Sequence, residues 1–372
     1  MLVKVEKNEL QNGIIMAMGA TSVSATQPIL SCLLFEVSDG GIQITGNNLE
    51  MSIRTAVITD NYTMDKQTGK AAIGARKIAD IIKNLPDGEV QIRTNDKHVT
   101  TITCGRSTFK VAGMDPDEYP TTIDIEPTGS FSISANVLKD MIRQTLFCAA
   151  PGATNPLLTG ALFNASSGCL EICALDMYRV AHSKKMTDYN GNDFKLVVPA
   201  RVLAEVAKLL TGKNNVTLTY DERNVWFDID GVKVMSKHIY GEFFNYVKIF
   251  SADRDTRINV GRIALIESMT RATLVEDKGK VAVKLTVSDN AMQISSTTAL
   301  SSLNDEIAIN GNGNDLTIAF NPNYFIEALR VMASDSVEMQ FSGPSSPCLI
   351  RPVSSEGSEQ ETSYIVVPLK AA

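Results

Sequence analysis

The sequence lacks the features of several common protein classes. No apolar run approaches the roughly 18 residues of a transmembrane helix. The alternating polarity of Met1–Glu6 is unlike the cationic start and apolar core of a signal peptide. The six cysteines are irregularly placed and do not form a disulfide framework. These absences predict a protein of the reducing cytoplasm that has no membrane partner.

Motifs for catalysis and cofactor binding are also missing. The chain has no Gly-Lys-Ser/Thr phosphate loop, so we do not expect it to hydrolyse ATP itself. His98, His182 and His238 stand far apart and show no general-base pattern. Cys169 and Cys173 have a spacing that zinc ligands can have, but no second ligand pair is evident, and we interpret them as structural. We therefore predict no catalytic residues, no metal and no cofactor.

Length and charge limit the domain count and the mode of nucleic-acid binding. A chain of 372 residues suits two or three domains, because a domain of roughly 120 residues buries enough apolar surface to fold without disulfides. The formal net charge of −7 argues against a protein that coats nucleic acid with its whole surface. A locally basic lining remains compatible with that total.

A strand followed by an amphipathic helix is repeated three times along the chain. Each helix has apolar residues three and four positions apart, which is the spacing of a buried helical face. Ile15 in the first copy and Ile263 in the third are expected on these apolar faces. The three copies are Leu2–Met18, Phe131–Phe147 and Arg257–Thr273.

A second helix follows at a similar distance in each copy. Glycine or proline precedes it each time, and proline suits the start of a helix. Between the two helices the chain reads as strands joined by hairpin turns such as Ser38–Gly41. The second helices are Ala75–Ile82, Ala200–Val206 and Asn323–Leu329.

These repeats predict an α+β protein of three similar domains, each with two helices on curved antiparallel sheets. Turn and charged residues cluster at the expected boundaries, so the predicted domains are residues 1–126, 127–252 and 253–372. The six helices together are net positive in a chain that is negative overall. This pattern favours a surface that contacts phosphates without reading sequence, although ordinary solvated helix faces would produce it too.

Local sequences resemble the bacterial DNA sliding clamp family, the beta subunit of DNA polymerase III. The matching stretches span the chain in the family's order, which makes the set more specific than any one of them. They are Gln27–Leu30 with Thr45–Met51, Ala75–Gly88, Gly105–Phe109 with Glu118–Pro120, Ala174–Ala181, Gly241–Tyr246 and Tyr364–Lys370.

The resemblance implies clamp-type domains in a head-to-tail homodimeric ring around duplex DNA, and a processivity subunit that is not an enzyme. Phe109 of one chain and Thr273 and Leu274 of the other are then expected at the dimer seam. The implied partners are duplex DNA without sequence preference and a clamp loader. Replicative and translesion polymerases, ligase and mismatch-repair proteins are expected to bind through short peptide motifs.

By the same resemblance, partners insert an extended peptide with Gln, Leu and Phe anchors into an apolar pocket between the second and third domains. From the second domain the expected pocket residues are Leu158, Leu175, Met177, Tyr178, Arg179, Val180, Phe244, Lys248 and Ile249. From the third domain they are Tyr324, Ser345, Pro347, Ile365, Val367, Pro368, Leu369 and Lys370.

This pocket departs from the family pattern. Met177 and Tyr178 replace the usual Gly-His pair, Phe244 stands where Pro is frequent, and Lys248 replaces an Arg. The substitutions indicate an altered peptide preference and leave open a specialised clamp paralogue with a regulatory or drug-tolerance role. A less favoured alternative is a three-domain transferase that uses the loops around Asp176.

The resemblance also indicates a set of basic helix residues that face DNA. Arg76, Lys77 and Arg201 match basic helix positions of the family. Further candidates are Lys83, Lys139, Arg143 and Lys208.

Overall fold

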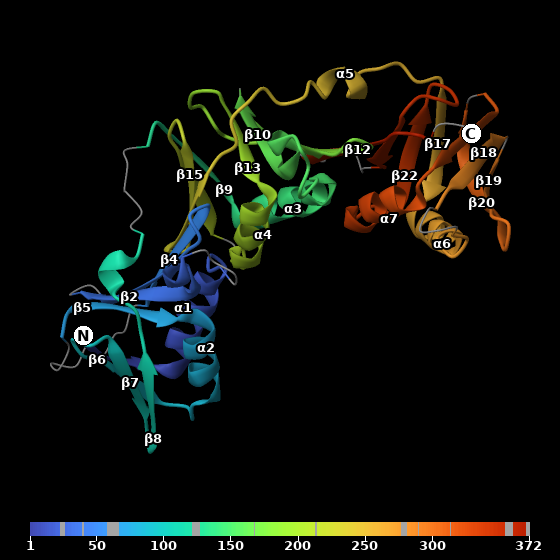
Figure 1. Cartoon of the computed structure of the whole chain (residues 1–372). Coiled ribbons are helices and arrows are strands. Elements are labelled where there is room, and N and C mark those ends of the chain that lie inside the picture. The colour runs from blue at the N-terminus through green and yellow to red at the C-terminus, as the bar shows by residue number, and fades with distance from the viewer. Residues whose placement is uncertain are drawn as a thin grey trace. The chain divides into compact units, whose positions relative to one another are not determined.

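The computed structural model describes residues 1–22, 27–38, 41–57, 67–120, 127–166, 168–212, 214–276, 281–288, 290–312, 314–353 and 360–369. The chain forms two compact units, each built from antiparallel sheets with helices packed on them (Figure 1). Unit 1 consists of Met1–Asn136 and Lys208–His238, and unit 2 of Val137–Ala207 and Ile239–Ala372.

The described part of unit 1 contains two antiparallel sheets. The smaller sheet has the order β1-β6-β7-β8, with β1 (Leu2–Glu6), β6 (Glu89–Thr94), β7 (Val99–Cys104) and β8 (Ser107–Ala112). The larger sheet has the order β5-β2-β3-β4-β16-β15-β14-β9. Its strands are β5 (Gly69–Gly74), β2 (Cys32–Ser38), β3 (Gly41–Asn47), β4 (Met51–Val57), β16 (Val232–Lys237), β15 (Asn224–Ile229), β14 (Asn215–Tyr220) and β9 (Gly129–Ser134).

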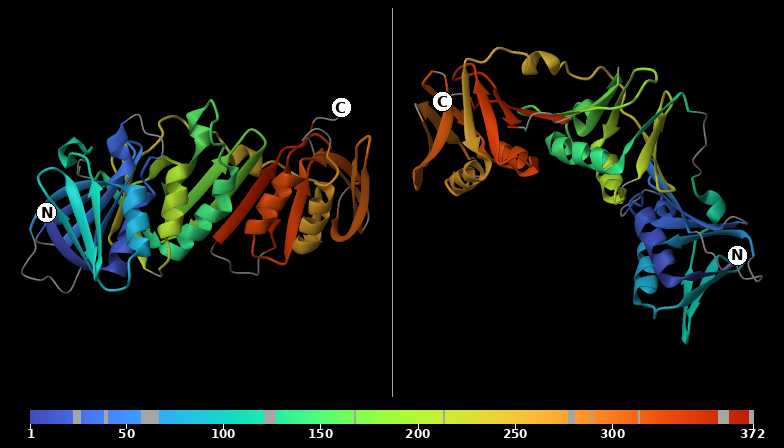
Figure 2. Two further views of the ribbon diagram at one scale, coloured as in Figure 1. Left: turned by 60° about the horizontal axis from the view of Figure 1, so that its bottom comes forward. Right: turned by 180° about the vertical axis from the view of Figure 1, so that it is seen from behind.

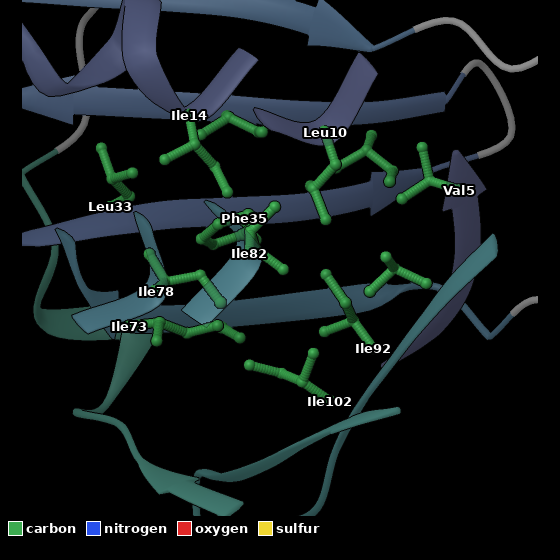
Figure 3. Packing of buried hydrophobic residues seen from close by; sticks show 14 of the residues in the cluster. Val5, Leu10, Ile14, Leu33, Phe35, Ile73, Ile78, Ile82, Ile92 and Ile102 are labelled. Carbon is green, nitrogen blue, oxygen red and sulfur yellow. The ribbon is translucent and has the colours of Figure 1, made fainter. Parts of the chain in front are cut away.

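Two helices, α1 (Lys7–Met18) and α2 (Ala75–Asn84), lie side by side against these sheets (Figure 2). Leu10 and Ile14 of α1 and Ile78 and Ile82 of α2 point into one apolar core (Figure 3). The approach of α1 to β3 is close, since a Cβ atom on Gly46 would lie 2.0 Å from the carbonyl oxygen of Ala17. The short 3-10 helices of this unit are η1 (Pro28–Ser31) and η2 (Pro116–Glu118).

The described part of unit 2 contains one long antiparallel sheet of the order β13-β10-β11-β12-β24-β23-β22-β17-β20-β19-β18-β21. Its first six strands are β13 (Phe194–Pro199), β10 (Gly160–Ser166), β11 (Cys169–Leu175), β12 (Arg179–Met186), β24 (Gln360–Val366) and β23 (Cys348–Pro352). The other six are β22 (Ser336–Phe341), β17 (Thr256–Gly261), β20 (Ser302–Asn312), β19 (Ala291–Thr297), β18 (Val283–Ser288) and β21 (Leu316–Phe320).

Helices α6 (Arg262–Ala272) and α7 (Pro322–Val331) of unit 2 lie side by side, and α6 packs on β17, β19 and β20 (Figures 1 and 2). Asn321 caps α7, because its side chain accepts a hydrogen bond from Asn323 N, and Pro322 occupies the first turn. The remaining helices are α3 (Ala135–Thr145), η3 (Leu146–Cys148), η4 (Pro156–Thr159), α4 (Ala200–Leu209) and α5 (Val247–Phe250).

All three predicted strand-helix repeats, and the second helix of each, are confirmed by β1-α1, β9-α3 and β17-α6 and by α2, α4 and α7. Two residues were assigned to the wrong helical face. Ile15 and Ile263 are 57% and 53% exposed. Apolar spacing marks the buried stripe of a helix but not the width of that stripe, which the packed sheet sets.

Residues of the predicted second domain contribute to both units. Strand β16 pairs with β4, and this pair joins β9, β14, β15 and β16 to the larger sheet of unit 1. Strand β12 pairs with β24, which joins β10–β13 to the sheet of unit 2. The sequence boundaries at 126/127 and 252/253 stay predictions. No helix in the described ranges is both long and apolar enough to cross a membrane.

Candidate functional site

Five of the predicted pocket residues meet in one apolar cluster of unit 2. Leu175, Val180 and Ile365 are buried, and Leu158 and Ile249 pack against them half-buried. The other members of the cluster are Leu162, Cys173, Val197, Tyr246 and Leu349, bordered by Leu157, Ile239, Phe243 and Phe250.

Strand register explains why these distant residues meet. Leu175 on β11 is the partner of Val180 on β12, and Val180 is the partner of Ile365 on β24. Ile365 in turn is the partner of Leu349 on β23. Directly paired residues of antiparallel strands share one face of the sheet, so the four side chains form a continuous apolar row. This row is the floor of the candidate pocket.

Three other residues predicted for the pocket are apolar and exposed. Met177, Tyr178 and Phe244 are 75%, 53% and 54% exposed. Lys248 is also exposed, so all four side chains can be reached from solvent.

The C-terminal residues are held against the pocket by main-chain hydrogen bonds. Val367 N donates to the carbonyl oxygen of Tyr178 at 2.8 Å, and Leu369 N donates to that of Ala319 at 2.8 Å. Pro368 between them is half-buried. Lys370 lies outside the described residues.

Ser345 and Pro347 precede β23 in the turn after β22. Ser345 is exposed and Pro347 is half-buried, and neither belongs to the apolar cluster. Both are therefore candidates for the edge of the pocket and not for its floor.

Arg179 links the pocket to α7. Its Nε donates to Asp176 Oδ2 at 3.0 Å, its Nη1 donates to Glu327, and its Nη2 donates to the carbonyl oxygen of Phe147 at 3.0 Å. Its Cζ lies 4.8 Å from the ring centroid of Tyr324, within cation–π range. Burial, followed by the negative charge of Asp176, raises the pKa of Tyr324.

A half-buried polar network that sequence reasoning missed lies beside this apolar floor. The hydroxyl of Tyr246 donates to Glu171 Oε2 at 2.6 Å, and Asn164 Nδ2 donates to the same oxygen at 3.3 Å. His182 Nε2 lies 3.6 Å from it. His182, then Tyr246 and Asn164, lower the pKa of Glu171 to about 2 against the opposing effect of burial. Burial and the hydrogen bond to Glu171 raise the pKa of Tyr246.

A second missed residue holds the segment around α5. Arg254 is only 7% exposed, and its guanidinium donates to the carbonyl oxygens of Ile249, Phe250 and Ala252 at 2.7, 3.3 and 2.8 Å. In the sequence this arginine is one of several charged residues near a predicted boundary. Only its burial distinguishes it, and burial depends on the fold.

The predicted DNA-facing residues are all exposed. Arg76, Lys77 and Lys83 lie on α2 of unit 1. The others are Lys139 and Arg143 on α3 and Arg201 and Lys208 on α4. Arg143 Nη2 forms an exposed ion pair with Asp140 at 3.3 Å, and such a pair contributes little to stability.

The predicted seam residues lie on open surfaces of their units. β8 pairs with β7 alone among the described strands, so one of its edges is open, and an open edge is a template for pairing with another chain. Phe109 on β8 is 42% exposed. In unit 2, Leu274 is 79% exposed after the end of α6, beside the half-buried Thr273.

Comparison with known protein families accounts for nearly the whole chain. Models of the N-terminal, central and C-terminal domains of the DNA polymerase III beta subunit match residues 1–124, 132–245 and 247–366 in that order. The chain belongs to the DNA polymerase III beta subunit family. A beta sliding clamp of Halalkalibacterium halodurans is 30% identical over 345 residues, which are 90% of this chain and 91% of the relative.

Other relatives are similar to this chain over nearly all or all of their length. A beta sliding clamp of Staphylococcus aureus is 28% identical over 358 residues, or 93% of each protein. The crystal structure of a DNA polymerase sliding clamp from Bacillus subtilis superposes with a TM-score of 0.94 at 27% identity, and all of both chains is covered.

Family membership confirms the three clamp-type domains and the interpretation as a sliding clamp and non-catalytic processivity subunit. It favours that interpretation over a transferase. Asp176, on which the transferase alternative depended, accepts hydrogen bonds from Tyr178 N at 2.7 Å and Arg179 N at 2.9 Å, as well as from Arg179 Nε. Its carboxylate is thus engaged in holding a turn.

Proposed function

We propose that the protein forms a head-to-tail homodimeric ring that encircles duplex DNA and tethers polymerases through the pocket of unit 2. The family match in all three domains is the observation that carries this proposal. Each chain contributes three domains, with boundaries at 126/127 and 252/253, and the assembly works in the cytoplasm. A heterologous contact that closes after two copies makes a ring and not a filament.

The seam joins the open edge of β8 to the surface at the end of α6. Phe109 supplies an aromatic anchor from one chain, and Leu274 and Thr273 supply the receiving surface of the other. Support comes from the exposure of Phe109 and Leu274 in the single chain, because covering large apolar side chains with a partner surface lowers the free energy.

Exposed basic residues of α2, α3 and α4 face the encircled DNA. Sequence-independent binding needs only phosphate contacts, and a closed ring stays on its DNA without high affinity. The negative total charge of −7 is compatible with this arrangement, since the basic residues named here are gathered on helices.

Partners insert an apolar peptide over the row Leu175, Val180 and Ile365, with Leu158 and Ile249 at its side. A pocket with apolar walls and few polar groups suits Leu and Phe anchors. The partners are a clamp loader, replicative and translesion polymerases, ligase and mismatch-repair proteins. Each is proposed to bind through a short extended motif.

Mass in solution combined with binding of a clamp-motif peptide tests the proposal. We expect twice the mass of the 40.3 kDa chain and saturable binding of a peptide with Gln, Leu and Phe anchors. A protein that stays monomeric at micromolar concentration and binds no such peptide would contradict both parts of the proposal.

A further inference from the structure

The guanidinium of Arg179 is engaged within the protein. Each of its three guanidinium nitrogens already donates a hydrogen bond within the protein, and its side chain is 12% exposed. One guanidinium therefore pairs with two carboxylates, Asp176 and Glu327, so these three groups together carry one net negative charge. The Glu327 side chain is 44% exposed, so a ligand can reach this charge from solvent.

The rings of Tyr178 and Tyr324 are nearly parallel, with centroids 6.0 Å apart and an interplanar angle of 18°. Two hydrogen bonds hold the main chain of Tyr178 in place, because its N donates to Asp176 Oδ1 and its carbonyl oxygen accepts from Val367 N. A third ring does not fit between the two, since each stacked pair needs a centroid separation of about 4.5 Å or more. A ligand must use the exposed side of the pair.

We propose that Tyr178 and Tyr324 form an aromatic platform that receives a basic side chain of the partner peptide, next to its apolar anchors. An aromatic ring face attracts a cation, and the net negative charge around Arg179 adds to that attraction. Met177, the residue before Tyr178, is 75% exposed and offers an adaptable apolar side chain for the methylene stem of Lys or Arg. An acidic side chain is repelled at the same place.

The proposal of an aromatic platform depends on the proposed peptide pocket, and it adds a preference for the charge of the bound peptide. Arg179 holds Tyr324 in place from below the surface, and a rigid platform loses less entropy when a ligand binds than a mobile one does.

Calorimetric binding of matched peptides tests this inference. Each peptide carries the same Gln, Leu and Phe anchors, with one flanking residue at a time changed to Lys or to neutral norleucine. We expect Lys to bind about three- to fivefold more tightly than norleucine at one flanking position. Glu at that position binds more weakly than norleucine, and the Lys advantage shrinks at high salt.

Three variants identify the groups responsible. Tyr178→Ala is expected to abolish the Lys preference, and Tyr178→Phe, which keeps the ring, is expected to retain it. Glu327→Gln reduces the preference without removing the platform, and its circular dichroism spectrum checks that α7 remains folded.

The two proposals fail in different ways. If neither the Lys nor the norleucine peptides bind, the pocket itself is wrong. If all bind and Lys equals norleucine at every position, the pocket stands and the platform is wrong. A Lys preference that survives Tyr178→Ala would equally overturn the platform.

Discussion

The hydroxyl of Tyr246 lies 2.6 Å from Oε2 of Glu171, to which it donates a hydrogen bond. This contact joins the segment before α5 to strand β11 across 75 residues of sequence. Tyr246 also belongs to the apolar cluster that contains Leu175, Val180 and Ile365. A polar anchor inside the protein thus holds part of the proposed partner site in place.

Tyr246→Phe is expected to lower the free energy of unfolding by about 1–3 kcal/mol. The change keeps the buried ring but removes one donor from a carboxylate that has lost most of its water. Urea denaturation measures the effect, and Tyr178→Phe, at an exposed tyrosine, is the matched control with a change near zero. Equal stability of both variants would show that the hydrogen bond contributes nothing.

The lowered pKa of Glu171 predicts that the free energy of unfolding falls in acid. Its pKa is lowered from the ordinary 4.5 to about 2, mainly by His182 and then by Tyr246. A lowered folded-state pKa stabilises the protein fully above the unfolded value, and this contribution is lost as the pH falls through about 2. Between pH 4.5 and 2 the wild type should therefore lose more stability than Glu171→Gln. Parallel curves of urea midpoint against pH for the two proteins would contradict this assignment.

The double change Tyr324→Ala with Met177→Lys is expected to weaken clamp-motif peptide binding by about tenfold or more. Loss of one aromatic hot-spot side chain alone has an effect of this size, and the new lysine adds positive charge and bulk at position 177. Met186→Lys, also an exposed methionine of unit 2, is the control. Unchanged affinity of the double variant would mean that the pocket has been placed wrongly.

Substitutions at the proposed dimer seam should lower the mass of the protein in solution, because the dimer dissociates. Phe109→Asp, or Leu274→Asp, should raise the dimer dissociation constant by about tenfold or more, because each puts a carboxylate into an apolar contact. Analytical ultracentrifugation over a dilution series measures the effect. Ile15→Asp replaces an exposed apolar residue on α1 and should leave the dimer intact. A dimer that resists both seam changes would require another interface.

The basic residues of α2 predict a change in the salt dependence of DNA binding. Arg76→Ala with Lys77→Ala should reduce the slope of log affinity against log salt by up to about two on open linear duplex. The closed ring around circular DNA should still be retained, since retention is topological. Lys97→Ala, at an exposed turn of unit 1, should leave the slope unchanged. An equal loss for both variants would argue against a DNA-facing α2.

Much of the fold followed from local pattern. Helix spacing found the repeats, and alternation with turn residues found the hairpin β2-β3, because these signals act over a few residues. The exposure of Ile15 and Ile263 did not follow, since it depends on which part of each helix the sheet covers. Strands of the predicted second domain join two different sheets through the pairs β16-β4 and β12-β24. These pairs connect residues far apart in the sequence, so local patterns do not predict them.

The candidate site shows the same limit. Resemblance to the family supplied Leu175, Val180 and Ile365, and strand register then brought them together. Tyr246 lay inside a matched motif yet was passed over, because its value comes from a hydrogen bond to Glu171 that only the fold creates. The contacts of the Arg179 guanidinium with Glu327 on α7 and with Phe147 on η3 also depend on the fold, because no local pattern reveals them.

Retention of the protein on circular and on linear DNA tests the central claim most directly. The protein is loaded onto nicked circular duplex by its clamp loader and ATP, and gel filtration in about 0.5 M salt then separates bound from free protein after simple phosphate contacts have been screened. An encircling ring predicts that the protein stays with the circle and is released when one cut makes the DNA linear. Equal retention on circular and linear DNA, or no retention on either, would contradict the account.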